Sequence, residues 1–321
     1  MKKELYFFCK IKKDKQMTKI NILLLLFLLF GGCSESEKQS VIDTIQDLNI
    51  NNNAEAKTLT KLDDNLSEVS GLVNIEGTLW GHNDSGGKAE LYSISSSSGK
   101  ILKTVEISNA SNIDWEDLTF DETHLFIGDF GNNQGKRKNL KIYKISLNDL
   151  KTKTEVSAEI LDFSYATQTE FQANSKNNYD CEAFIAYESK LYLFSKNHGN
   201  EQTDVYVLTK EKGTQVAEKV SNYDVNALIT GASMDIDNKT LVLIGYSDKG
   251  TPKTWIFSGF TDVDFFKGKQ KRLSWGTPAK AQIEGVTHMA KGKLYISAEK
   301  FDYSNSLGSF TVNQTLYELK Y

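Results

Sequence analysis

The stretch Asp114-Trp115-Glu116-Asp117-Leu118 decides the fold, because variants of it recur along the chain. Close variants are Asp180-Cys181-Glu182-Ala183-Phe184 and Gln282-Ile283-Glu284-Gly285-Val286. Looser variants are Glu68-Val69-Ser70-Gly71-Leu72 and Thr230-Gly231-Ala232-Ser233-Met234. Burying a carboxylate beside apolar residues is costly, so its repetition suggests that the carboxylates are gathered for a purpose.

A second apolar segment follows each motif at a nearly fixed distance. The leucines that mark it lie seven residues after the motif in four units and eight residues after it in the fifth: Leu79, Leu125, Leu191, Leu241 and Leu294. Third strands are expected at 90–94, 141–145, 204–208, 253–257 and 315–319, and fourth strands at 101–105, 158–163 and 214–217. Short apolar alternations bounded by Gly, Asn, Asp and Ser are typical of strands and turns. Four-stranded units in series predict an all-β protein with a β-propeller fold.

The fifth unit ends after its third strand. Residues 57–62, in front of the first motif, are expected to supply the missing fourth strand and to close the ring. This gives five four-stranded blades over residues 57–321. A sixth blade stays open as an alternative, because the interval between Leu118 and Phe184 is the longest and contains an apparent insertion at 167–179.

The beginning of the chain has the pattern of an export signal. Lysines precede an apolar run at 22–30, and Gly31-Gly32-Cys33 follows. This order predicts a signal peptide over residues 1–32, with Met17 as an alternative start. The Gly-Gly-Cys sequence resembles the lipobox of bacterial lipoproteins, which implies a lipidated Cys33. An ordinary signal peptide with a chance cysteine is the alternative.

The polar segment 33–56 predicts a tether between this anchor and the folded part. We therefore expect a protein of the bacterial cell envelope, held by lipid in the outer membrane and either periplasmic or surface-exposed. Cys181 is the only cysteine of residues 57–321, which excludes a disulfide or a cysteine metal site there. The net charge of -4 gives no nucleic-acid footprint, and we expect a monomer.

Propeller geometry would bring the motifs and the loops after the second strands to one mouth of the central channel. The predicted metal ligands are the glutamates at one motif position and two loop aspartates: Glu116, Glu182, Glu284, Asp84 and Asp129. Crowded carboxylates need protons, ion pairs or a bound cation. Oxygen ligands favour Ca²⁺, or else Mg²⁺, over zinc. The alternative is a polar plug in which Lys196 and Lys300 neutralise the carboxylates.

Other polar residues at this mouth are candidate ligand-binding groups: Asn83, Asp117, Asn132, Lys196, Asn197 and Lys300. His82 and His198 come from mouth loops and are the candidate acid or base residues. Simple hydrogen bonding by these histidines is the alternative. Lys136-Arg137-Lys138 is interpreted as a solvated basic turn.

These residues resemble those of bacterial secreted β-propellers of the esterase-like or phytase-like group. The segments that carry the resemblance are 68–72, 82–87, 114–118, 128–132 and 180–183. The resemblance implies metal-dependent hydrolysis of a phosphoester, ester or lactone, with Ca²⁺ bound along the channel. In our enzyme hypothesis the cation activates water, and His82 or His198 moves protons. A fold does not fix a function. The alternative is a non-enzymatic scaffold that binds a small molecule, a glycan or a protein through a purely structural channel.

Overall fold

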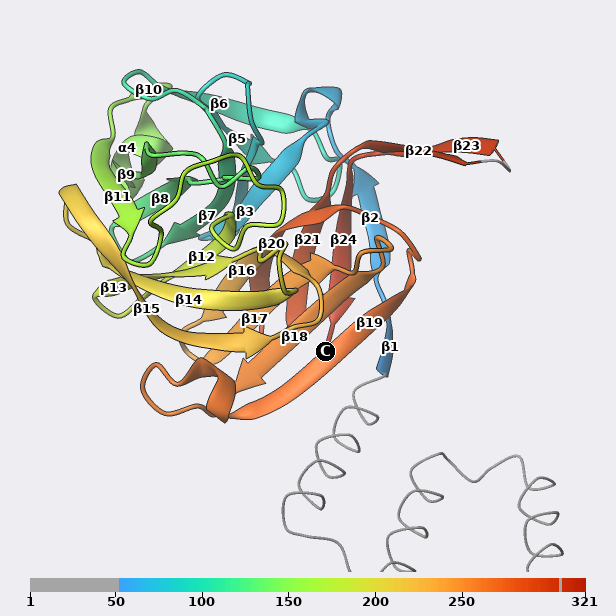
Figure 1. Ribbon diagram of the computed structural model, residues 1–321. Helices are drawn as coiled ribbons and strands as arrows, with labels where there is room; N and C mark the ends of the chain where they lie inside the picture. The colour runs from blue at the N-terminus through green and yellow to red at the C-terminus, as the bar shows by residue number, and fades with distance from the viewer. Residues whose placement is uncertain (1–51, 306–307) are drawn as a thin grey trace, which may run out of the picture. The chain divides into compact units, whose positions relative to one another are not determined.

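The computed structural model describes residues 52–305 and 308–321 (Figure 1). The predicted signal peptide, Met17, Cys33 and residues 33–51 of the predicted tether lie outside the described residues. Residues 53–321 form a compact unit of their own. No helix within 52–305 and 308–321 combines the length and the apolar character needed to cross a membrane.

The described residues are built almost entirely from strands, as the sequence predicts. The first sheet contains the first repeat unit and one added outer strand: β3 (Val69–Ile75), β4 (Thr78–Asn83), β5 (Glu90–Ile94), β6 (Ile101–Ile107) and β10 (Glu155–Val156). Strand β10 is parallel to β6, and the other neighbouring pairs are antiparallel. The two residues of β10 are too few to show an apolar alternation, so the sequence did not reveal them.

One eight-stranded sheet contains both the second and the third repeat units. Its strands, in sheet order, are β7 (Trp115–Phe120), β8 (His124–Asp129), β9 (Leu140–Ser146), β11 (Glu159–Tyr165), β15 (Gly213–Asp224), β14 (Gln202–Thr209), β13 (Lys190–Ser195) and β12 (Cys181–Tyr187). The two units join where β11 pairs in parallel with β15. The edge strands β7 and β12 also lie beside each other, so the sheet nearly closes like a barrel. A short helix, α4 (Leu147–Thr152), follows β9.

Two further sheets contain the fourth and fifth units. The fourth comprises β16 (Leu228–Asp235), β17 (Thr240–Tyr246), β18 (Pro252–Ser258), β19 (Lys269–Thr277) and β1 (Asn52–Glu55). The fifth comprises β20 (Ile283–Ala290), β21 (Lys293–Ala298), β24 (Thr315–Lys320) and β2 (Lys57–Lys61). Strand β2 thus pairs with β24, the position expected for the segment 57–62. The end of the predicted tether is strand β1, so ordered structure starts before Lys57.

Three smaller elements complete the described chain. They are the 3₁₀ turns η1 (Asp64–Leu66) and η2 (Phe265–Lys267) and the hairpin of β22 (Phe301–Asn305) and β23 (Gly308–Val312). The hairpin projects away from the sheets (Figure 1).

The motif strands β3, β7, β12, β16 and β20 gather at the centre (Figure 1). Strand β3 lies beside β7 and β20, β12 lies beside β7 and β16, and β16 lies beside β20. Side-chain hydrogen bonds link these neighbours: Ser70 Oγ donates to the Glu116 carbonyl, and the Ala186 amide donates to Thr119 Oγ1 at 2.9 Å. The arrangement is a propeller-like β fold.

The glycines of the motif have a packing reason. A Cβ atom at Gly71 would lie 2.6 Å from the Leu118 amide nitrogen, and one at Gly285 would lie 2.3 Å from the Ser70 carbonyl oxygen. Only glycine lets the central strands approach this closely. Larger apolar residues such as the fully buried Trp115 fill the space between the sheets.

Candidate metal centre

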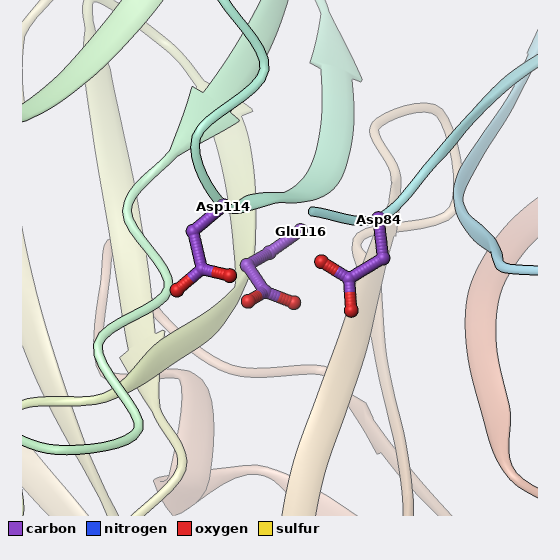
Figure 2. Close-up of side chains that lie close together, drawn as sticks. All are labelled: Asp84, Asp114 and Glu116. Atoms are coloured by element: carbon purple, nitrogen blue, oxygen red, sulfur yellow. The ribbon is translucent and has the colours of Figure 1, made fainter. Parts of the chain in front are cut away.

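The motif carboxylates and the loops that follow β4, β8 and β13 lie at the same end of the central strands. Three carboxylates converge there: Asp84, just after β4, and Asp114 and Glu116 at the start of β7 (Figure 2). One carboxylate oxygen from each lies within 4.8 Å of the others. Asp114 lies in a bend just before β7, and Glu116 lies at an irregularity in the pairing of β7 with β8.

Gly131 makes room for this group. A Cβ atom there would lie 1.9 Å from Glu116 Oε1 and 2.6 Å from Asp114 Oδ2. The loop after β8 can therefore pass against two carboxylates only because residue 131 lacks a side chain. The result is a set of hard oxygen donors, which suits Ca²⁺ or Mg²⁺. In this respect the residues present fit a divalent cation.

Two side chains hold the three carboxylates in place. Asn112 Nδ2 donates to the carbonyl oxygens of Asn83 at 3.0 Å and Asp84 at 2.7 Å, while its Oδ1 accepts from the Trp115 amide at 3.1 Å. This ties the Asp84 loop to the start of β7. Asp129 Oδ1 accepts from the Asp114 amide at 3.2 Å and from Arg137 Nη2 at 2.7 Å.

A second group of carboxylates, Glu116, Asp180 and Glu182, shares Glu116 with the first. Here a cationic side chain is already present. Lys196 Nζ donates to both carboxylate oxygens of Glu182 at 2.6 Å and to the Tyr246 hydroxyl at 3.2 Å. The lysine side chain is only 8% exposed, so the pair is screened little by solvent. This part of the mouth is neutralised by the protein itself.

Burial and mutual repulsion shift the carboxylates of the first group toward the protonated form. Burial raises the pKa of Asp84 to about 6. Burial, and then the charge of Asp84, raise the pKa of Asp114 to about 7. Burial, followed by the charges of Glu182 and Asp84, raises the pKa of Glu116 well above its usual range. A bound cation would favour the ionised form of all three carboxylates and lower their pKa values.

The two candidate histidines differ in position. His82 is fully buried with its ring edge-on to Trp115, at a centroid distance of 5.5 Å. Burial lowers the pKa of His82 to about 4, so it is neutral at pH 7. His198 Nε2 lies 2.8 Å from Asp180 Oδ2, beside the second carboxylate group. Of these two histidines, His198 is the one that is partly exposed.

Three of the predicted ligand-binding asparagines form hydrogen bonds within the protein. The main-chain amide of Asn132 donates to Asp180 Oδ1 at 2.6 Å, and Asn83 Nδ2 donates to the Asn65 carbonyl at 2.7 Å. Asn197 Oδ1 accepts from Ser195 Oγ at 2.6 Å, and Lys300 is exposed.

Asp117 is fully buried between three central strands, where it accepts main-chain hydrogen bonds. The predicted ligands Asp129 and Glu284 belong to neither group of converging carboxylates. The structure therefore brings together Asp84, Glu116 and Glu182 of the five predicted metal ligands.

Two carboxylates of the groups, Asp114 and Asp180, were not predicted as ligands. Each lies two residues before a predicted glutamate, and the recurrence of this Asp-x-Glu spacing in two motifs could have identified both. Arg137 also differs from its interpretation as part of a solvated basic turn. Its side chain is 12% exposed, and its Nη1 donates to the Gly131 carbonyl at 2.7 Å. The buried Asp129 carboxylate is the reason, because it requires a partner.

No protein-family model matches the chain, and no curated protein does. Among solved structures, the tail fiber of Staphylococcus aureus phage P68 is similar, with a TM-score of 0.42, 12% identity, and coverage of 87% of this chain and 56% of that chain. Kuenenia stuttgartiensis hydrazine synthase has a TM-score of 0.37 and 11% identity, with coverage of 74% of this chain and 57% of that chain. A chain of a mitotic checkpoint complex has a TM-score of 0.36 and 9% identity, with coverage of 79% of this chain and 62% of that chain. The chain spans less than two thirds of each of these chains. Similarity this distant says nothing about function, and the fold and site define only a propeller-like β protein with a buried acidic cluster that could hold a metal ion.

Proposed function

We propose that the chain is a five-bladed β-propeller, closed by β2, whose acidic mouth binds a divalent cation. Two observations support the blade count. Each of the five repeat units contributes four neighbouring strands of a sheet, and each motif strand lies beside two other motif strands. The convergence of Asp84, Asp114 and Glu116 beside Gly131 carries the metal proposal. Ca²⁺ is the first candidate and Mg²⁺ the second, since the donors are all carboxylate oxygens.

The same mouth is suited to hydrolysis of a phosphoester, an ester or a lactone. A bound divalent cation would polarise the substrate oxygen and lower the pKa of a coordinated water. His198, whose Nε2 lies 2.8 Å from Asp180 Oδ2, would accept the proton. His82 is the weaker candidate for this role, because it is fully buried against Trp115.

A non-enzymatic scaffold is the second candidate. It is favoured by the Lys196–Glu182 pair and by the hydrogen bonds to Asp180, which satisfy half of the mouth internally. In that case a small molecule, a glycan or a protein would bind over the other half, and the metal would be structural.

Calcium titration of the chelator-treated protein tests the metal proposal. We expect binding to the wild type and a loss of at least about tenfold in affinity in Glu116→Gln, because one charged ligand becomes a neutral amide. Glu284→Gln is the matched control, since Glu284 is buried at the same mouth but lies outside both carboxylate groups. Absence of calcium and magnesium binding to the wild type would sink the proposal.

Activity separates the two candidates. If the cation binds, hydrolysis of a panel of phosphoesters, lactones and aryl esters that disappears in Glu116→Gln identifies an enzyme. Binding without turnover supports the scaffold.

We also propose that the protein is a lipoprotein of the bacterial envelope, anchored in the outer membrane. The apolar run at 22–30 and the Gly31-Gly32-Cys33 sequence support this. Cys33→Ser should move the protein from the membrane fraction to the soluble fraction of the envelope. Unchanged fractionation would contradict the anchor.

A further inference from the structure

A pocket of about 410 Å³ lies between the sheets of the fourth and fifth repeat units, away from the carboxylates. Its walls come from the β16–β17 turn, the end of β18, the start of β19 and the β20–β21 turn. These segments lie at the end of the central strands opposite to the acidic mouth. Three lysines line the pocket: Lys269, Lys271 and Lys291.

The three lysines come from two different sheets. Lys269 and Lys271 are two residues apart on β19, so their side chains leave the same face of the strand, about 7 Å apart along it. They lie opposite Ser258 and Ile256 of β18. Lys291 lies in the turn between β20 and β21, in the sheet of the fifth unit. The Tyr321 amide donates a hydrogen bond to the Gly292 carbonyl of this turn at 3.1 Å.

These lysines differ from many others in lacking a counter-charge. Some lysines elsewhere in the sheets pair with carboxylates, as in Lys219–Asp204 at 2.7 Å and Lys293–Glu318 at 2.9 Å. Within 52–305 and 308–321, no carboxylate forms an ion pair with any of the three pocket lysines. Asp235, at the adjacent turn, accepts instead from the Asn238 amide at 3.0 Å. Three like charges around one pocket repel each other, and an anion would stabilise them.

We propose that this pocket binds a compact phosphate-bearing anion. Lysine ammonium groups act as point charges that suit phosphate, and their flexible stems adapt to its oxygens. The Ser258 hydroxyl adds a donor to the wall. The volume lies within the range of small-ligand sites. The site is separate from the metal centre, so the two proposals stand or fall independently.

Binding of inorganic pyrophosphate to the metal-free protein, followed by calorimetry at low salt, tests the proposal. The triple variant Lys269→Gln, Lys271→Gln, Lys291→Gln should lose at least about tenfold in affinity. The matched control replaces three exposed lysines outside the pocket and removes the same charge: Lys136→Gln, Lys212→Gln and Lys249→Gln. It should bind as the wild type does, apart from a small loss from long-range charge.

A lipid headgroup carries the same phosphate, and phosphatidylglycerol vesicles supply the second arm. Pyrophosphate binding that only the pocket variant loses identifies a free phosphate ligand. Vesicle binding without pyrophosphate binding, lost in the same variant, identifies a headgroup. If neither probe binds, or if both triple variants lose affinity equally, the proposal is wrong.

Discussion

At the scale of single residues, Asp117 shows how the motif builds the fold rather than the site. Its Oδ1 accepts from the Leu118 amide at 2.8 Å, and its Oδ2 accepts from the amides of Phe184 at 3.1 Å and Ala232 at 3.2 Å. One carboxylate therefore joins β7, β12 and β16. Burial raises the pKa of Asp117 well above its usual range, and the three amide donors oppose that shift.

Replacing Asp117 should destabilise the protein strongly. Asp117→Ala leaves buried amides of three strands without an acceptor, and each costs about 1–3 kcal/mol. We expect the free energy of unfolding to fall by roughly 3 kcal/mol or more, measured by urea denaturation. Asp117→Asn keeps one carbonyl acceptor and should lie between Asp117→Ala and the wild type. A loss below about 0.5 kcal/mol in Asp117→Ala, the range of ordinary surface substitutions, would contradict this role.

The sequence alone could predict which motif position carries the glutamates, but not how each glutamate is satisfied. Glu116 and Glu182 occupy equivalent positions, yet Glu116 meets Asp84 and Asp114 whereas Glu182 meets Lys196. The difference comes from loops: Gly131 opens space beside Glu116, and the loop after β13 supplies the lysine. Contacts between residues distant in sequence decide which groups surround each glutamate, and sequence periodicity contains no information about these contacts.

At the scale of elements, the alternation of apolar and polar residues predicts the positions of most strands. The motif strands and the strands that follow them are found where their spacing predicts. Strand β19 was missed because Lys269-Gln270-Lys271-Arg272 contains no apolar alternation, and the backbone is held by β18 and β1 instead. The parallel pairing of β11 with β15 could not be predicted from the sequence either. The first residues of β15 pair with β11, and only its later residues pair with β14.

The role of β2 gives a prediction at this scale. Strand β2 covers the edge of β24, with Lys57 opposite Glu318 and Lys61 opposite Thr315. A chain that starts at Leu62 should expose that edge, melt at least about 5 °C lower and aggregate. A chain that starts at Lys57 keeps β2 and lacks β1 and the residues before it, and it is the matched control. Equal melting temperatures for the two chains would show that β2 does not close the ring.

At the scale of the whole molecule, the buried charges set how stability depends on pH. Asp114 has a pKa of about 7, and burial raises the pKa of Glu299 to about 8. Both groups hold protons in the folded protein where the unfolded chain has already released them. Their contribution to stability is present at low pH and is lost as the pH rises through these values.

Histidines act in the opposite direction, but in a lower range. Burial lowers the pKa of both His82 and His288 to about 4, against an ordinary value of 6.5. Their stabilising contribution is therefore complete above pH 6.5 and is lost as the pH falls through 4. Between pH 6.5 and 8 the histidine contribution is constant, so the carboxyl groups with raised pKa values alone determine this part of the pH dependence of stability.

The metal-free protein should therefore become less stable as the pH rises from 6.5 to 8. Saturating Ca²⁺ should reduce that slope to the part that comes from Glu299, because a bound cation keeps Asp84, Asp114 and Glu116 ionised throughout. Calcium affinity should itself increase with pH. Urea denaturation at several pH values, with chelator and with calcium, measures both effects. Asp114→Asn removes one of the titrating groups and should flatten the slope in chelator. An identical slope with and without calcium would mean that no cation reaches these carboxylates, and the acidic mouth would then be held together by its protons.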